Sequence, residues 1–225
     1  MATVARPRPS PGVVLEGVPW ADYESRLRII GERHIRANYD SGRMELISPT
    51  GLRWPAVLSC LLDGMVYVLV GELDIQVEGA DPVTLKRPDL RKGIEPDKLY
   101  FFGANAAKVR GNRELDLTVD PPPELIVEFQ VTHGEIPRLP IFAVLGIPEV
   151  WRIDDDEKVQ FLHLQPDGTY QPRDHSRAFP VLSVAEAARF LEQGRGSDET
   201  AWIKTFRAFV REAIVPRRRA ESGNR

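Results

Sequence analysis

One stretch of the sequence, PPPELIVEFQVTH at positions 121–133, places two polar side chains inside an apolar run. In a β-strand, alternate side chains point to opposite faces, so Glu128 and Gln130 share a face with Ile126. Burying a carboxylate is costly unless a cation or several donors meet it. Glu128 is therefore either the ion-pair partner of an arginine or part of a reaction site. The opposite face is predicted to be core and carries Leu125, Val127, Phe129 and Val131.

Two further carboxylates lie on other predicted strands. Asp97, in GIEPDKLYF, follows a proline at the entrance to a strand, and Glu45, in RMELISP, has Met44 and Leu46 on the opposite face. Carboxylates from separate elements can converge on a hard divalent cation, and Mg²⁺ typically takes one or two of them while it keeps water ligands. The acids therefore allow a metal site.

The elements that would position these acids follow from hydrophobic periodicity and turn signals. We expect a mixed sheet with helices on its faces, in a domain of α/β or α+β class. Helices are predicted at 20–30, 54–70, 137–145, 183–193 and 198–214. Strands are predicted at 34–39, 43–48, 74–78, 83–87, 97–102, 124–131, 148–154, 158–164 and 169–172.

Length and composition predict one globular domain over 13–215, between a flexible Pro-rich arm at 1–12 and a disordered basic tail at 216–225. The formal net charge of -3 gives no global attraction for nucleic acid, so such a partner would need a local basic patch. The longest apolar stretch, 55–70, is too short and too polar to span a membrane.

The N-terminus has no apolar stretch of signal-peptide type, and the single cysteine excludes an internal disulfide. We therefore expect a reducing, cytoplasmic location. Cys60 lies among leucines and is predicted to be a core thiol rather than a nucleophile.

Four runs in chain order, YDSGRMELISP, RPDLRKGIEPDKLYF, DLTVDPPPELIVEFQVT and RLPIFAVLGIPEVWRID, resemble the Uma-two family of putative restriction endonucleases, a branch of the PD-(D/E)XK phosphodiesterase superfamily. The resemblance covers about residues 15–214 and implies a restriction-endonuclease-like core. It implies that Asp97 and Glu128 bind Mg²⁺ or Mn²⁺, with Glu45 as an outlying acid. Such a metal lowers the pKa of a bound water and stabilises charge on the scissile phosphate.

The sequence departs from the family pattern around this site. Gln130 stands where relatives usually carry an aspartate, which should weaken metal binding. Arg138 stands at the position of a lysine; it can neutralise phosphate but cannot accept a proton from water. Phe142 replaces a usual tyrosine. At the start of the long helix, the usual acidic and histidine positions are Leu52, Arg53 and Trp54.

Other polar residues carry two interpretations each. His133 could act as a base or lie on an exposed loop. Lys98 could replace the absent lysine, although strand alternation points it away from Asp97. Trp151 fits the core better than a base-stacking platform. Six basic residues flank Asp97 in sequence and could either follow a phosphate backbone or form an ordinary solvated surface: Arg87, Arg91, Lys92, Lys108, Arg110 and Arg113.

The leading hypothesis is a metal-dependent endonuclease that hydrolyses nucleic acid, DNA rather than RNA, and is compatible with a homodimer. Asp97 and Glu128 would hold the ion, and Gln130 would orient a ligand water. Glu45 would assist from a neighbouring element, and Arg138 would stabilise charge on the phosphate. The alternatives are a catalytically degenerate protein of the same fold that binds nucleic acid or a protein partner, and an unrelated role on that fold.

Overall fold

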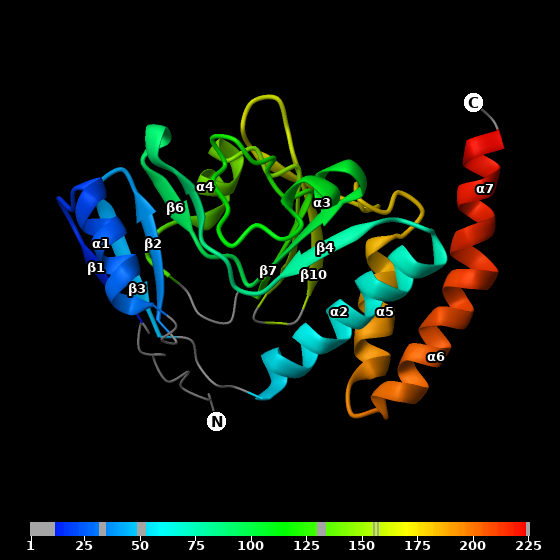
Figure 1. Ribbon diagram of the computed structural model, residues 1–225. Coiled ribbons are helices and arrows are strands. Elements are labelled where there is room, and N and C mark those ends of the chain that lie inside the picture. The colour runs from blue at the N-terminus through cyan, green and yellow to red at the C-terminus, as the bar shows by residue number, and fades with distance from the viewer. Residues whose placement is uncertain are drawn as a thin grey trace, which may run out of the picture.

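The chain folds into two β-sheets flanked by helices, as seen in the computed structural model, which describes residues 12–31, 35–48, 53–129, 134–154, 156 and 158–223 (Figure 1). The first sheet is antiparallel and has the strand order β1(Gly12–Leu15), β3(Arg43–Ile47), β2(Arg36–Asp40), β6(Lys92–Ile94), β5(Leu85–Arg87). The second has the order β11(Tyr170–Arg173), β10(Val159–Leu164), β9(Glu149–Ile153), β8(Leu125–Phe129), β7(Lys98–Phe102), β4(Val77–Ala80).

The predicted α+β class, a mixed sheet with helices, is confirmed, but the strands divide between two sheets where we expected one. Pro82 lies between β4 and β5, and Pro96 lies between β6 and β7. Proline has no backbone N–H and interrupts a ladder. The chain therefore crosses from one sheet to the other at both points.

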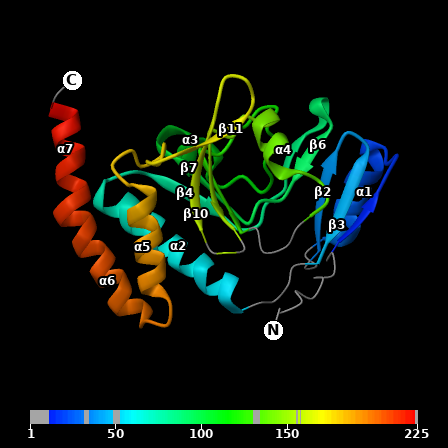
Figure 2. The same ribbon diagram turned by 180° about the vertical axis from the view of Figure 1, so that it is seen from behind.

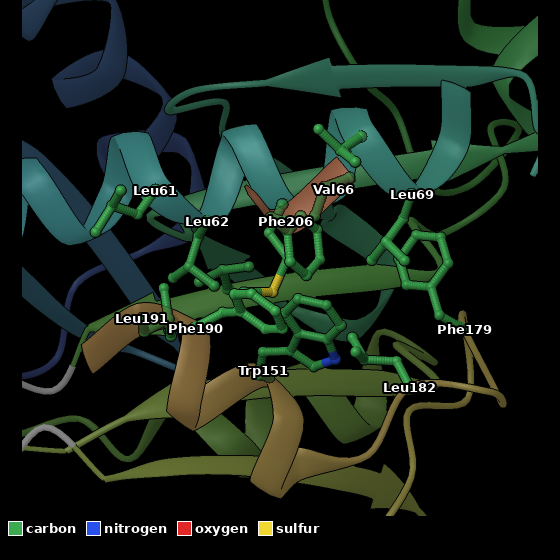
Figure 3. Close-up of a cluster of buried hydrophobic side chains, with 14 of the residues drawn as sticks. Leu61, Leu62, Val66, Leu69, Trp151, Phe179, Leu182, Phe190, Leu191 and Phe206 are labelled. Carbon is green, nitrogen blue, oxygen red and sulfur yellow. The ribbon is translucent and has the colours of Figure 1, made fainter. Parts of the chain in front are cut away.

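The second sheet is buried on both faces. On one face lie α2(Arg53–Glu72), α5(Val184–Gly194) and α6(Glu199–Phe209), whose side chains surround Trp151 (Figure 3). The opposite face packs against α3(Gly103–Val109) and α4(Arg138–Val144). Trp151 is a core residue, as predicted.

The central strand β8 consequently contributes to two cores. Leu125 and Val127 pack into the first core, while Ile126 packs into the second with residues of α4. The candidate site face, which carries Glu128, is therefore covered by α4 at Ile126. On this side, the strand becomes polar at Glu128.

The first sheet has its own helix on one face. α1(Trp20–Ile30) covers it, and Tyr23 stacks on Tyr39 with ring centroids 4.9 Å apart. Figure 2 shows β2 and β6 between α1 and α4. Because Ala37, Tyr39 and Met44 point toward α1, the alternate residues of β2 and β3 point to the opposite face.

The C-terminal segment corrects one prediction. α6 continues through a π-helical turn, Val210–Ile214, into α7(Val215–Gly223), so residues 216–223 are helical and not a disordered tail. The π turn ends just before Pro216, whose missing N–H interrupts the α-helical ladder. Arg217 then anchors α7 through a 2.8 Å ion pair with Glu186. Residues 224–225 and most of the predicted N-terminal arm, 1–11, lie outside the described residues, and Gly12 belongs to β1.

A second correction concerns the single cysteine. Leu58, Leu61, Leu62 and Met65 form the buried stripe of α2, and Cys60 lies off that stripe and is exposed.

Of the helices in the described ranges, none is both long and apolar enough to cross a membrane.

Candidate active site

Asp97 and Glu128 are brought together by strand pairing. In the antiparallel ladder of β7 and β8, Lys98 lies opposite Val127, so the next residues outward are Asp97 and Glu128. The Asp97 backbone N–H donates to Glu128 Oε1 at 3.2 Å, and the N–H of Phe129 donates to Asp97 Oδ2 at 2.8 Å. The two carboxylates therefore lie side by side, with side chains 17% and 10% exposed.

Each carboxylate faces a guanidinium group. Arg138, the first residue of α4, places Nε 2.7 Å from Glu128 Oε2 and donates from Nη2 to Oε1 at 3.0 Å. The Nε contact is ionic rather than a hydrogen bond, because no acceptor lies along that N–H in the described structure. Arg36 pairs with Asp97 Oδ1 from β2. The first interpretation of Glu128, an ion pair with an arginine, is thus what the structure contains.

Further contacts hold Arg138 in place. Its Nη2 also donates to the backbone carbonyl of Glu95, and its guanidinium lies 5.8 Å from the ring centroid of Phe142, one turn along α4. Phe142 is fully buried, so it supports Arg138 from the core. The Arg138 side chain is therefore held by contacts on several sides.

Burial dominates the electrostatics of the site. Desolvation raises the pKa of Glu128 to about 7, although Arg138 opposes the shift, and the neighbouring charge of Asp97 raises it further. Burial also raises the pKa of Glu95. For Arg138, burial lowers the pKa but Glu128 and Asp97 outweigh it, so the net direction is upward. Glu128 and Glu95 therefore hold a proton more readily than exposed carboxylates do, and Arg138 stays protonated.

Glu45 reaches the site from the first sheet. It is 1% exposed and lies opposite Asn38 in the β2–β3 ladder. Asn38 Nδ2 donates to Glu45 Oε2 at 3.2 Å, while Asn38 Oδ1 accepts from the Glu95 N–H at 3.2 Å. The N–H of Glu135 donates to Glu45 Oε1. A Cβ at residue 134 would lie 2.7 Å from Glu45 Oε2, so this close approach requires Gly134.

The site carries more acid than base. Four carboxylates, those of Glu45, Glu95, Asp97 and Glu128, interact with the guanidinium groups of Arg36 and Arg138. If all ionise, two negative charges remain in excess, which is the charge that a divalent ion would neutralise. Within the described residues, however, no three His, Cys, Asp or Glu side chains are grouped to hold a metal. With only Asp97 and Glu128 side by side, an ion at this place would need water and phosphate oxygens to complete its coordination.

Comparison with known proteins places the chain in a family. Residues 20–192 match the Uma2 family, described as "Putative restriction endonuclease". The chain belongs to the Uma2 family. Its fold is also similar to the crystal structure of a "putative nuclease belonging to DUF820 from Anabaena variabilis ATCC 29413", with 15% sequence identity and a TM-score of 0.47 over 69% of this chain and 90% of that chain. No curated protein matches the sequence.

In this Uma2 family chain, several predicted site residues lie elsewhere or cannot be placed. Lys98 points to the opposite face of β7, as alternation predicted, and pairs with Asp63 and Asp81 at 2.6 Å each. It therefore does not replace the family's lysine beside Asp97. Predictions for Gln130, His133 and Leu52 lie outside the described residues, as do the side chains of Arg53 and Trp54.

Three of the six residues of the predicted basic patch have local acidic partners. Arg87 pairs with Asp89 at 2.7 Å, and Arg110 lies 3.4 Å from Glu78. Lys92 pairs with Asp40 across the β2–β6 ladder. These contacts favour the interpretation of an ordinary solvated surface over a continuous phosphate-binding track.

Sequence analysis missed three residues of this Uma2 site: Arg36, Asn38 and Glu95. A signal for the first two was present, because in HIRANY the residues Arg36 and Asn38 alternate with the apolar Ala37 and Tyr39. Two polar residues on one face of a short strand indicate a polar environment opposite that face. Their partners were not predictable, since Asp97 and Glu95 lie about 60 residues further along the chain.

Proposed function

We propose that the chain is a Mg²⁺- or Mn²⁺-dependent endonuclease that hydrolyses phosphodiester bonds of nucleic acid, with DNA as its substrate. Membership of the Uma2 family supports a nuclease in general terms. The observation that carries the finer proposal is the side-by-side placement of Asp97 and Glu128 at the end of the β7–β8 ladder, with a guanidinium group at each. Paired carboxylates suit a divalent ion, and guanidinium groups suit phosphate.

In this proposal, Asp97 and Glu128 hold the metal, which when bound supplies an activated water and stabilises charge on the phosphate. Glu45, fixed by Asn38 and the backbone of Glu135, acts through its charge near Arg138. Arg138 stabilises negative charge on the phosphate in the transition state. Gln130 is proposed to orient a ligand water.

Arg138 also limits the rate. Its guanidinium remains protonated, so it cannot accept a proton from water as a lysine amine could. Its planar fork is held on Glu128 and on the carbonyl of Glu95. We therefore expect slow cleavage, and we expect Arg138→Lys to increase it.

The test is cleavage of supercoiled plasmid and of single-stranded oligonucleotides with Mn²⁺. Asp97→Ala and Glu128→Ala should abolish activity, whereas Arg138→Lys should increase it. The double variant Gln130→Asp, Arg138→Lys should gain most, because it restores an anionic ligand and the lysine. Arg211→Lys is a matched control, since Arg211 pairs with Glu72 at the surface of the C-terminal helices.

Light scattering tests the homodimer that would cut both strands, and cell fractionation tests the proposed cytoplasmic location.

A catalytically degenerate protein that binds nucleic acid or a protein partner is the second candidate. The ion pairs of Asp97 and Glu128 favour it, because both carboxylates already have cationic partners. If neither the wild type nor the double variant cuts any nucleic acid, while the wild type binds nucleic acid without metal, this second function replaces the first.

A further inference from the structure

We propose that Arg36 is a phosphate-binding residue that guards Asp97, so that nucleic acid and the divalent ion bind cooperatively. This inference rests on the proposed function, because it concerns how the same site is opened. Arg36 would leave Asp97 for a backbone phosphate, and that exchange would release the carboxylate oxygen that the ion needs.

The first support is that every oxygen of the two carboxylates is already engaged. Asp97 Oδ1 contacts Arg36, and Oδ2 accepts from the N–H of Phe129. Glu128 Oε1 accepts from the Asp97 N–H and from Arg138, and Oε2 lies 2.7 Å from Arg138 Nε. A cation that binds Asp97 Oδ1 must therefore displace Arg36, whereas Glu128 Oε2 accepts no hydrogen bond from the described residues and has only the ionic contact with Arg138 Nε.

The second support is that the two arginines are held very differently. Arg138 contacts both oxygens of Glu128, the carbonyl of Glu95 and the ring of Phe142. Among the described residues, Arg36 hydrogen-bonds to Asp97 alone. It is the first residue of β2, and its side chain is as exposed as that of Arg138, at 21%, so the difference lies in the contacts. Arg36 is therefore the guanidinium that can move at the lower cost.

The third support is the geometry that remains after Arg36 moves. The N–H of Phe129 still binds Asp97 Oδ2 and keeps the carboxylate oriented beside Glu128. Arg36 can exchange one anion for another, because a guanidinium fork pairs with phosphate as well as with carboxylate. Arg36 and a metal ion compete for Asp97, whereas a phosphate and a metal ion do not. Phosphate should therefore strengthen metal binding, and the effect must be reciprocal.

The test is calorimetry of Mn²⁺ binding with and without a phosphorothioate-linked single-stranded oligonucleotide, which resists hydrolysis. In the wild type, this oligonucleotide should tighten Mn²⁺ binding about tenfold or more. An uncharged methylphosphonate oligonucleotide of the same length should not. Arg36→Gln should bind Mn²⁺ about tenfold more tightly than the wild type without any oligonucleotide, and should lose the coupling.

Two further variants test whether the change in Mn²⁺ binding comes from the charge of Arg36 rather than from a disturbed fold. Arg43→Gln removes an arginine of the neighbouring strand that pairs with Glu16, and should behave as the wild type. Arg36→Lys keeps a cation and should retain the coupling in part, so it replaces Arg36→Gln if that variant does not fold. If the coupling survives in Arg36→Gln, or if that variant binds Mn²⁺ with unchanged affinity, the role proposed for Arg36 is overturned. The proposed metal site is not overturned by either result. Failure of every protein to bind Mn²⁺, with or without oligonucleotide, overturns the proposed metal site as well.

Discussion

Replacing Glu128 by glutamine should remove a large part of the pH dependence of folding stability. Glu128 is buried beside Asp97, and desolvation raises its pKa from 4.5 to about 7. The folded protein therefore binds this proton more tightly than the unfolded chain does. Stability from this group is fully present below about pH 4.5 and is lost as the pH rises through about 7.

The size of the effect follows from the shift. One pKa unit corresponds to about 1.4 kcal/mol, so a shift of roughly two and a half units is worth about 3 kcal/mol. Glutamine cannot ionise, so Glu128→Gln lacks this change. Glu95, whose pKa is also raised by burial, is present in both proteins and cancels when they are compared. The wild type should therefore lose about 3 kcal/mol relative to the variant between about pH 4.5 and pH 8.

The assay is urea unfolding followed by tryptophan fluorescence, in the presence of a chelator, at several pH values across this range. The quantity to follow with pH is the difference between the free energies of unfolding of the wild type and of Glu128→Gln. The variant also leaves Arg138 without its carboxylate, but that cost is nearly constant with pH and does not change the shape of the curve. Parallel stability curves for the two proteins would refute the assignment of a raised pKa to Glu128. Asp89→Asn, at an exposed ion pair with Arg87, is the control for removing a carboxylate.

Three other changes test separate parts of the structure. Glu149→Gln should lower the free energy of unfolding by about 3 kcal/mol. The reason is that this fully buried carboxylate accepts four hydrogen bonds from residues 151 and 176–178. A free energy of unfolding in urea equal to that of the wild type would contradict this. Gly134→Ala should destabilise the fold by about 1–3 kcal/mol, because its Cβ would lie 2.7 Å from Glu45 Oε2; a neutral result in thermal unfolding would show that the 134–135 segment moves freely. Gln130→Asp should tighten Mn²⁺ binding, because it adds an anionic ligand; calorimetry that shows equal or weaker affinity would count against Gln130 as a neighbour of the metal.

The central strand shows how much the sequence could predict. The apolar run around Glu128 identified β8, and alternation placed Lys98 on the face away from Asp97. The convergence of Asp97 and Glu128 was also foreseen, because the two carboxylates lie on separate predicted strands that can bring them to one site. These features depend on local patterns, which a single sequence contains.

The parts that failed depend on contacts between distant segments. Arg36 and Asn38 come into the site only because the first sheet turns one face toward the end of the β7–β8 ladder. The division into two sheets depends on how Pro82 and Pro96 redirect the chain. The helix α7 depends on the π turn before Pro216 and on the ion pair of Arg217 with Glu186. Local periodicity shows at most that Arg36 and Asn38 share a polar strand face, and it does not indicate the distant partners in any of these contacts.

The central claim is that Asp97 and Glu128 together hold a divalent ion during cleavage of nucleic acid. The most direct measurement is an anomalous difference map from crystals grown with Mn²⁺ and a phosphorothioate oligonucleotide. The account predicts a peak between the carboxylates of Asp97 and Glu128, with Arg36 moved from Asp97 to a phosphate. A map in which both ion pairs persist and no peak lies between these two carboxylates would contradict it.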